Sequence, residues 1–142
     1  SCRFKYDISG NRIEETCHDP KGKLTEKKLF TFDAEGNKLE ENFFNKGGKS
    51  ERKYTCSYDS VGNIIEEKLY RSDILIYELS ALYNESGLRT EDSETEYNSE
   101  GKILKKKTNL YTYDERKNWI KKTIFENEIP RFVVERDIKY YP

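Results

Sequence analysis

The phrase FKYDISGNRIEE, at residues 4–15, decides the fold of this chain because it is repeated in line. It returns as FTFDAEGNKLEE at residues 30–41 and as CSYDSVGNIIEE at residues 56–67, each time 26 residues further on. A fixed period of this size is typical of one supersecondary unit that recurs along the chain. The repeat therefore predicts an architecture and leaves the function open.

Each copy of the phrase has the pattern of a β-hairpin. Phe4 and Tyr6 are two residues apart, so they share one face of a strand. Asp7 can begin a four-residue turn, and Gly10 can supply the left-handed conformation that ends it. A second turn, at residues 19–23 in the first copy, leads into the next hairpin. The sequence predicts an all-β antiparallel meander of repeated hairpins, with about ten strands in a twisted or curled single sheet.

The later copies depart from the phrase. Asparagine replaces aspartate in YNESGL at residues 83–88 and in YNSEGKI at residues 97–103, and Lys117 replaces the glycine in YTYDERKNWI. The turn at residues 71–74 has no glycine, and residues 132–141 have the pattern of a closing strand. We expect one domain over residues 1–142, with about five repeats, that is a fragment of a longer exported chain.

The register follows if the first turn is centred between Ser9 and Gly10, so that paired residue numbers sum to 19. An aromatic residue then faces an aliphatic one in each hairpin: the pairs are Tyr6–Ile13, Phe32–Leu39 and Tyr58–Ile65. One face carries the apolar side chains: Phe4, Tyr6, Ile13, Phe30, Phe32, Leu39, Phe43, Tyr54, Tyr58, Ile65 and Leu69. The other face carries charges, which include Glu14, Glu40, Glu66, Lys27 and Lys53.

The same register places Cys2 opposite Cys17. A cross-strand disulfide there would stabilise the chain by about 3 kcal/mol through loop entropy, and it requires an oxidising compartment. Two reduced, packed thiols are the alternative, and a lipid-anchored Cys2 behind a lipoprotein cleavage site is another. Cys56 stands where Phe4 and Phe30 stand in their copies, so we interpret it as a small core residue.

Composition and motifs argue against several classes of protein. Lys and Arg (26) nearly cancel Asp and Glu (27), whereas a nucleic-acid binder usually has a basic excess. No stretch has the roughly 18 apolar residues of a membrane span. His18 is the only histidine, and the three cysteines lack zinc spacing. Because the Glu14-Glu15 pairs recur with the repeat, they indicate surface charge. We expect no enzyme, no cofactor and no metal site.

Trp119 is the candidate for ligand contact. It stands where Arg12, Lys38 and Ile64 stand in other copies, on the face expected to be exposed. An exposed ring on a sheet can stack on the face of a sugar. The alternative is that Trp119 covers the final strands as an end cap, which repeat arrays require.

The pattern Tyr6-Asp7-x-x-Gly10-Asn11-x-Ile13, with its later copies at Tyr58-Asp59 and Tyr113-Asp114, resembles the YD repeat of bacterial RHS-type proteins. The resemblance covers most of the chain. It implies β-hairpin sheets that can wind into a shell, a secreted or cell-surface location, and glycan binding. The chain differs in its longer period, in having Gly-Asn after the turn where the family has Gly-Arg, and in lacking a recognisable RHS core motif or toxin domain.

The leading hypothesis is a non-catalytic extracytoplasmic repeat module, secreted or at the bacterial cell surface, that acts as a scaffold or interaction surface. Its expected partner is a protein or glycan at the cell surface, or a second copy joined through the aromatic face. Two alternatives stay open: a carbohydrate-binding module, and a shell fragment of a polymorphic-toxin protein of the RHS type.

Overall fold

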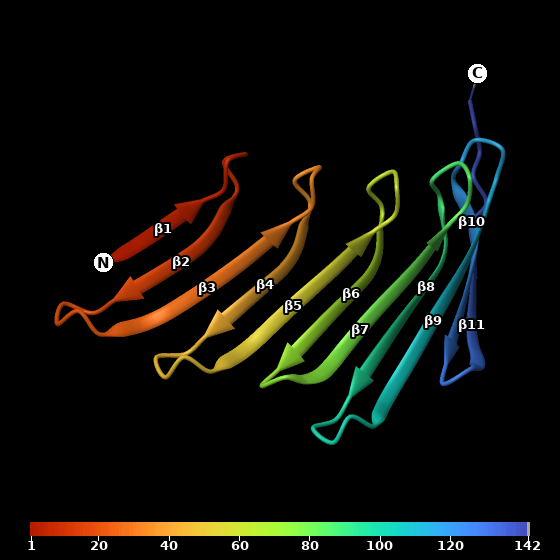
Figure 1. The fold of residues 1–142 in the computed structure, drawn as a ribbon. Coiled ribbons are helices and arrows are strands. Elements are labelled where there is room, and N and C mark those ends of the chain that lie inside the picture. The colour runs from red at the N-terminus through yellow and green to blue at the C-terminus, as the bar shows by residue number, and fades with distance from the viewer. Residues whose placement is uncertain (142) are drawn as a thin grey trace.

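The computed structural model describes residues 1–141, which form eleven antiparallel strands in one open sheet (Figure 1). The order of the strands in the sheet is their order in the sequence, and no residue of this range is helical. The predicted all-β meander is confirmed, with eleven strands in place of about ten. The strands are β1 (Cys2–Tyr6), β2 (Arg12–His18), β3 (Leu24–Phe32), β4 (Lys38–Phe44), β5 (Ser50–Tyr58), β6 (Ile64–Arg71), β7 (Ile74–Tyr83), β8 (Arg89–Tyr97), β9 (Ile103–Tyr113), β10 (Trp119–Glu126) and β11 (Ile129–Glu135).

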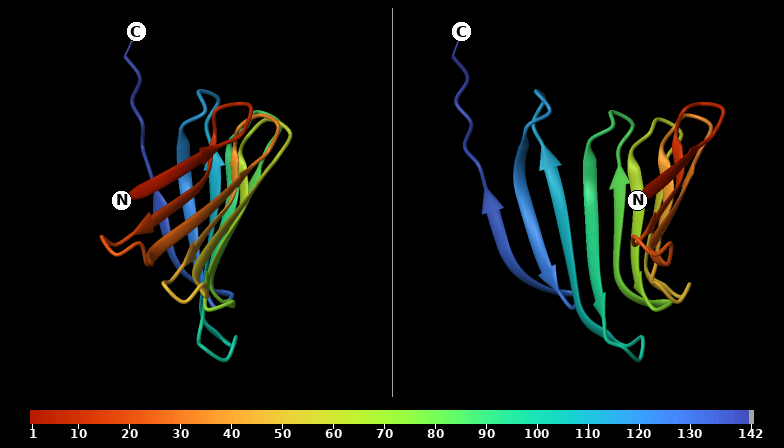
Figure 2. Two further views of the ribbon diagram at one scale, coloured as in Figure 1. Left: turned by 60° about the vertical axis from the view of Figure 1, so that its left-hand side comes forward. Right: turned by 90° about the vertical axis from the view of Figure 1, so that its left-hand side faces the viewer.

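The sheet is twisted and curved, and β1 and β11 form its two edges (Figure 2). Each strand contacts only its neighbours along the chain. Such a single layer buries little apolar surface: the buried hydrophobic residues of the described range are Phe30, Cys56 and Ala81. The interpretation of Cys56 as a small core residue is therefore confirmed. Because contacts are local, each hairpin is stabilised mainly by the hairpins beside it.

The aspartate of the phrase organises the turn, as the sequence predicts. The backbone N–H of Gly10 donates to the Asp7 carbonyl at 3.2 Å, and the Asp7 Oδ1 atom accepts the N–H groups of Ser9 and Asn11 at 2.9 Å. The side-chain amide of Asn11 also donates to the Asp7 carboxylate. This bond is the main reason why the pKa of Asp7 lies below its usual value, and the backbone N–H groups lower it further. Gly10 has a φ of 86°, in the left-handed region. The same Oδ1 contacts recur at Asp19, Asp33, Asn45, Asp59, Asn84, Asn98 and Asp114.

Lys117 adopts the glycine conformation of this turn, with a φ of 65°. A side chain in the left-handed region costs about 1–2 kcal/mol. A Cβ atom at the equivalent Gly10 would meet nothing within 4 Å, so the cost lies in the backbone and not in crowding. We expect Lys117→Gly to raise the free energy of unfolding by about 1 kcal/mol, measured by urea denaturation. Lys117→Ala is the matched control; an equal gain from alanine would contradict this explanation.

Two connections are tighter than the sequence suggests. Ser72 and Asp73 join β6 to β7, and Asn127 and Glu128 join β10 to β11, all with φ between 48° and 67°. Successive residues with positive φ are typical of two-residue type I′ hairpin turns. The turn at Asn127 and Glu128 was not predicted, so the bounds predicted for the closing strand, residues 132–141, are wrong. The closing strand is Ile129–Glu135, and the chain leaves the sheet after it.

The predicted register holds from Cys2–Cys17 to Lys5–Glu14 and fails beside the turn. There Tyr6 pairs with Arg12, and the ladder carries a β-bulge that leaves Ile13 without a direct partner. The later copies shift in the same way, with Phe32 opposite Lys38 and Tyr58 opposite Ile64. The three predicted aromatic–aliphatic pairs are therefore wrong, because a bulge places two residues opposite one and changes the register.

The apolar face is largely as predicted. Phe30 is buried, and Phe32 and Tyr58 are half-buried, whereas Phe4 and Tyr6 are exposed on the edge strand β1. We call this side of the sheet the aromatic face. Its acidic members were not anticipated: cross-strand partners share a face, so the second glutamate of each phrase lies among the rings. The pairs that place them there are Phe4–Glu15, Phe30–Glu41 and Cys56–Glu67.

Candidate functional site

The tyrosine of the YD phrase joins neighbouring hairpins. The Tyr58 hydroxyl donates to the Lys38 carbonyl at 3.1 Å, and Tyr83 and Tyr113 make the equivalent bonds to Ile64 and Arg89 at 3.0 and 2.6 Å. The register between β4 and β5 ends at Glu40–Thr55, short of the turn. Each hydroxyl therefore binds a carbonyl beyond the end of the ladder between two hairpins. This contact accounts for the tyrosine without a ligand.

Phe32 occupies the tyrosine position of its own hairpin but has no hydroxyl. We expect Phe32→Tyr to raise the free energy of unfolding by about 1 kcal/mol, by donating to the Arg12 carbonyl, and Tyr58→Phe to lower it by a similar amount. Tyr6→Phe is the control, since no hairpin precedes β1 in the sheet. Urea denaturation measures all three. A loss for Tyr6→Phe as large as for Tyr58→Phe would count against the cross-hairpin bond.

The half-buried glutamates of the aromatic face are paired. Glu15 lies 3.4 Å from the Arg12 guanidinium and 3.8 Å from the Lys28 ammonium group. Glu41 pairs with Lys38 at 2.5 Å. Glu67 accepts a hydrogen bond from the Tyr54 hydroxyl, and burial, followed by this contact, raises the pKa of Tyr54. Each of these carboxylates therefore has a cation or a hydroxyl group of the sheet as its partner.

The most buried polar cluster lies on β8 and β9. Asp92 is 4% exposed. Its carboxylate accepts hydrogen bonds from the Asn109 side-chain amide at 2.5 Å and from the Tyr111 hydroxyl at 2.9 Å. The Arg89 guanidinium lies 3.8 Å from the same carboxylate. Burial, followed by the bond to Asp92, raises the pKa of Tyr111 to about 12. The Asn109 Oδ1 atom has no partner within residues 1–141. No motif or spacing in the sequence predicts this cluster.

The raised tyrosine pKa values predict a loss of stability in alkali. The neighbouring Cys56 thiol, followed by burial, also raises the pKa of Tyr58 to about 12. An unfolded tyrosine loses its proton near pH 10, so between pH 10 and 12 the folded chain binds more protons and its stability falls. We expect the urea midpoint to decrease steadily across this range. Tyr111→Phe should decrease less steeply, and an unchanged slope would exclude Tyr111 as a contributor.

Trp119 does not lie on the exposed face, and the prediction from the repeat is wrong on this point. It pairs with Tyr113 beside a bulge, as Arg12 pairs with Tyr6, and it therefore belongs to the aromatic face. The ring is half-buried, and the Arg136 guanidinium lies 4.3 Å from its centre. Beyond Arg136, the Tyr140 hydroxyl donates to the Asp114 carboxylate of the last phrase. The segment after β11 thus contacts both Trp119 and the turn beside it.

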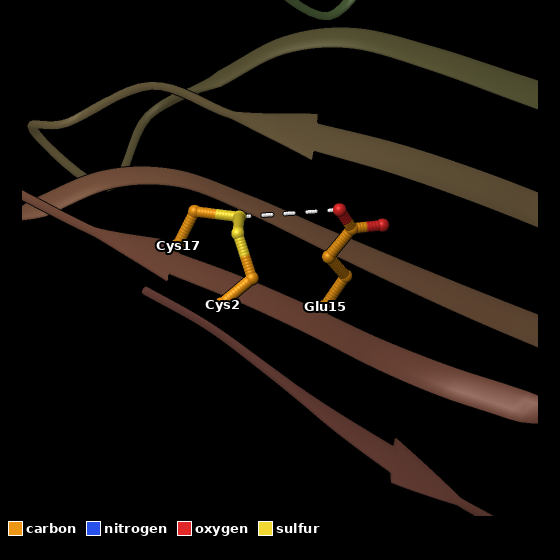
Figure 3. A group of neighbouring side chains, drawn as sticks. All are labelled: Cys2, Glu15 and Cys17. Atoms are coloured by element: carbon orange, nitrogen blue, oxygen red, sulfur yellow. Dashed lines mark hydrogen bonds between the residues drawn. A yellow bond between two sulfur atoms is a disulfide. The ribbon is translucent and has the colours of Figure 1, made fainter.

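Cys2 and Cys17 lie opposite each other and are joined by a disulfide (Figure 3). The Glu15 Oε1 atom lies 3.9 Å from the Cys17 sulfur, so three potential metal ligands are close together. Metal coordination by cysteine requires the thiolate, which a disulfide does not offer. In its oxidised form this group therefore fastens the edge strand β1 to β2.

These features define a class: an open meander of β-hairpin repeats whose recurring polar groups maintain turns and strand contacts. No known protein family matches the sequence, and a search of curated proteins found no match. None of the residues that the structure describes forms a helix long and apolar enough to cross a membrane.

Part of a solved structure shares the fold. A chain of the crystal structure of TcdB2-TccC3-Cdc42 has a TM-score of 0.60 at 12% identity, over 94% of this chain and 8% of that chain. A chain of the Photorhabdus luminescens Tc holotoxin pore has a TM-score of 0.49 at 15% identity, and the match covers 94% of this chain and 8% of that chain. A DUF3836 family protein from Parabacteroides distasonis has a TM-score of 0.25 at 19% identity, and the match covers 92% of both chains. This chain thus spans about 8% of the length of the first two.

Proposed function

We propose that this chain is a non-catalytic repeat module of an exported bacterial protein, in which it acts as a scaffold or interaction surface. The observation that carries the proposal is that the recurring side chains make contacts within the sheet itself. The aspartate builds the turn, the tyrosine joins hairpins, and the second glutamate pairs with a cation or a tyrosine. The aspartate, the tyrosine and the second glutamate of the phrase therefore each have a structural role.

Several observations support an exported location and a place within a larger protein. The disulfide between Cys2 and Cys17 suits an oxidising, extracytoplasmic compartment. The YD phrase resembles the repeats of RHS-type proteins, and a chain of the TcdB2-TccC3-Cdc42 structure shares the fold. An open sheet with two free edges also suits a segment of a larger wall, so a shell fragment of an RHS-type protein is the finer form of this proposal.

Deletion of one repeat tests the scaffold proposal. Removal of residues 33–58 joins Phe32 to Asp59 and keeps the phrase in phase, because the deleted segment is one full period. A module whose strands contact only their neighbours should fold without it, with the same β-sheet signal per residue in circular dichroism. A deletion of residues 33–50, which breaks the period, is the control. Equal unfolding of both variants would refute the modular scaffold.

Carbohydrate binding through Tyr and Trp is the alternative. The Arg136 guanidinium covers one face of the Trp119 ring, so a sugar would stack on the other face or displace Arg136. A glycan array with the intact chain, Trp119→Ala and the exposed control Tyr141→Ala separates the two functions. Binding that is lost only with Trp119→Ala would replace the scaffold proposal. Dimerisation through the aromatic face stays a prediction, to be measured by sedimentation.

A further inference from the structure

The chain after β11 contacts the last hairpin through every second residue. The Arg136 guanidinium lies 4.3 Å from the centre of the Trp119 ring, Ile138 is half-buried, and the Tyr140 side chain reaches the turn between β9 and β10. Tyr140 is 41% exposed, whereas the adjacent Tyr141 is 85% exposed. Alternate residues of an extended segment point the same way, so residues 136–141 lie against the hairpin in an extended form.

The Tyr140 hydroxyl is inserted into the turn of the last phrase. In the first three copies, the asparagine side-chain amide of the phrase donates directly to the aspartate carboxylate, at 3.0, 2.9 and 2.8 Å. In the last copy, the Asn118 amide donates to the Tyr140 hydroxyl at 2.7 Å, and this hydroxyl donates to the Asp114 carboxylate. A hydroxyl is both a donor and an acceptor, so it matches this pair of groups, whereas the ring of a phenylalanine cannot make either bond.

Two side chains peculiar to the last copy also contact this segment. Arg116 stands where the first three copies have serine, glutamate and valine, and its guanidinium lies 4.1 Å from the centre of the Tyr140 ring. Trp119 stands where those copies have arginine, lysine and isoleucine, and its ring carries the Arg136 guanidinium. A cation over an aromatic face is attracted by the ring. Two departures from the repeated phrase thus each match one side chain of the segment.

We propose that Trp119 and the turn at residues 114–118 form a peptide-binding site, which residues 136–141 of this chain occupy reversibly. The site recognises an extended segment with an arginine and a tyrosine four residues apart: the indole takes the arginine, and the turn takes the tyrosine. The contacts lie at the surface, where each is weak, so the segment can open and close. When closed, it covers one face of Trp119 at the end of the array. This inference goes beyond the proposed function and holds for a scaffold and for a carbohydrate-binding module.

Fluorescence of Trp119, the only tryptophan of the chain, reports whether the segment is closed. Acrylamide quenching is measured on the full chain, with excitation at a wavelength that tyrosine does not absorb. Tyr140→Phe removes both bonds of the hydroxyl, so the open fraction should increase roughly threefold and the quenching constant should rise. Tyr141→Phe is the matched control and should behave as the parent does. An unchanged quenching constant in Tyr140→Phe, or an equal rise in Tyr141→Phe, would overturn the proposal.

A free peptide with the sequence of residues 136–141 tests recognition itself. The full-length variant with both Arg136→Gln and Tyr140→Phe leaves the site open, and both changes lie outside the eleven strands. The peptide should lower the quenching constant saturably, with half-saturation at or below the roughly millimolar effective concentration of a short tether. The same peptide with Tyr140→Phe should bind roughly threefold more weakly. The proposal fails if neither peptide protects Trp119, or if both protect it equally. Should the double variant lose the circular dichroism of the sheet, the single variant Tyr140→Phe takes its place.

Discussion

Replacement of Asp92 by alanine is expected to lower the free energy of unfolding by about 3 kcal/mol, a larger loss than for any other single substitution proposed in the centre of the sheet. Asp92 is 4% exposed and Asn109 is 2% exposed. Without the carboxylate, the Asn109 amide and the Tyr111 hydroxyl lose their acceptor, and each unpaired buried group costs about 1–3 kcal/mol. Urea denaturation followed by circular dichroism measures the loss.

Two controls separate this mechanism from a general sensitivity of β8. Glu91 precedes Asp92 and alternates onto the other face, where it is half-exposed, so Glu91→Ala should cost no more than about 0.5 kcal/mol. The double variant Asp92→Ala with Asn109→Ala should lose less than the sum of its two single variants, because it leaves no amide unpaired. Additive losses, or equal losses at Glu91 and Asp92, would show that the cluster does not act as a unit.

The turns could be predicted from the sequence because their determinants are local. Asp7 and Gly10 lie three residues apart, and their roles depend only on the backbone between them. Register needs more information. The bulge beside Tyr6 depends on how the whole hairpin twists. A register counted from the turn therefore assigns Ile13 as the partner of Tyr6, one residue beyond the true partner, Arg12.

The polar cluster at Asp92 was not predictable in the same way. Asp92 lies in a copy where asparagine replaces the aspartate of the phrase, and Glu91-Asp92 has the composition of a solvated pair. The available signal was positional: Asp92 precedes its two partners by one strand, and the small residue Ala81 faces it from β7.

Reduction of the Cys2–Cys17 disulfide is expected to release β1 and to leave the rest of the sheet folded. All five residues of β1 are exposed, and the strand contacts only β2. The loop-entropy account of a 15-residue loop assigns the bond about 3 kcal/mol, which corresponds to roughly a 100-fold change in local opening. The β1 amides should therefore exchange with deuterium about 100-fold faster after reduction.

Hydrogen exchange measured by mass spectrometry, with and without a phosphine reductant, tests this expectation strand by strand. In a sheet with contacts only between sequence neighbours, the loss of an edge strand should not propagate. Protection in β5 and β9 should thus stay the same, and the variant with both Cys2→Ser and Cys17→Ser should match the reduced chain. Cys56→Ser controls for the reductant acting on the free thiol. Faster exchange across all eleven strands would mean that the sheet unfolds as one unit, so that the disulfide holds the whole array rather than its edge.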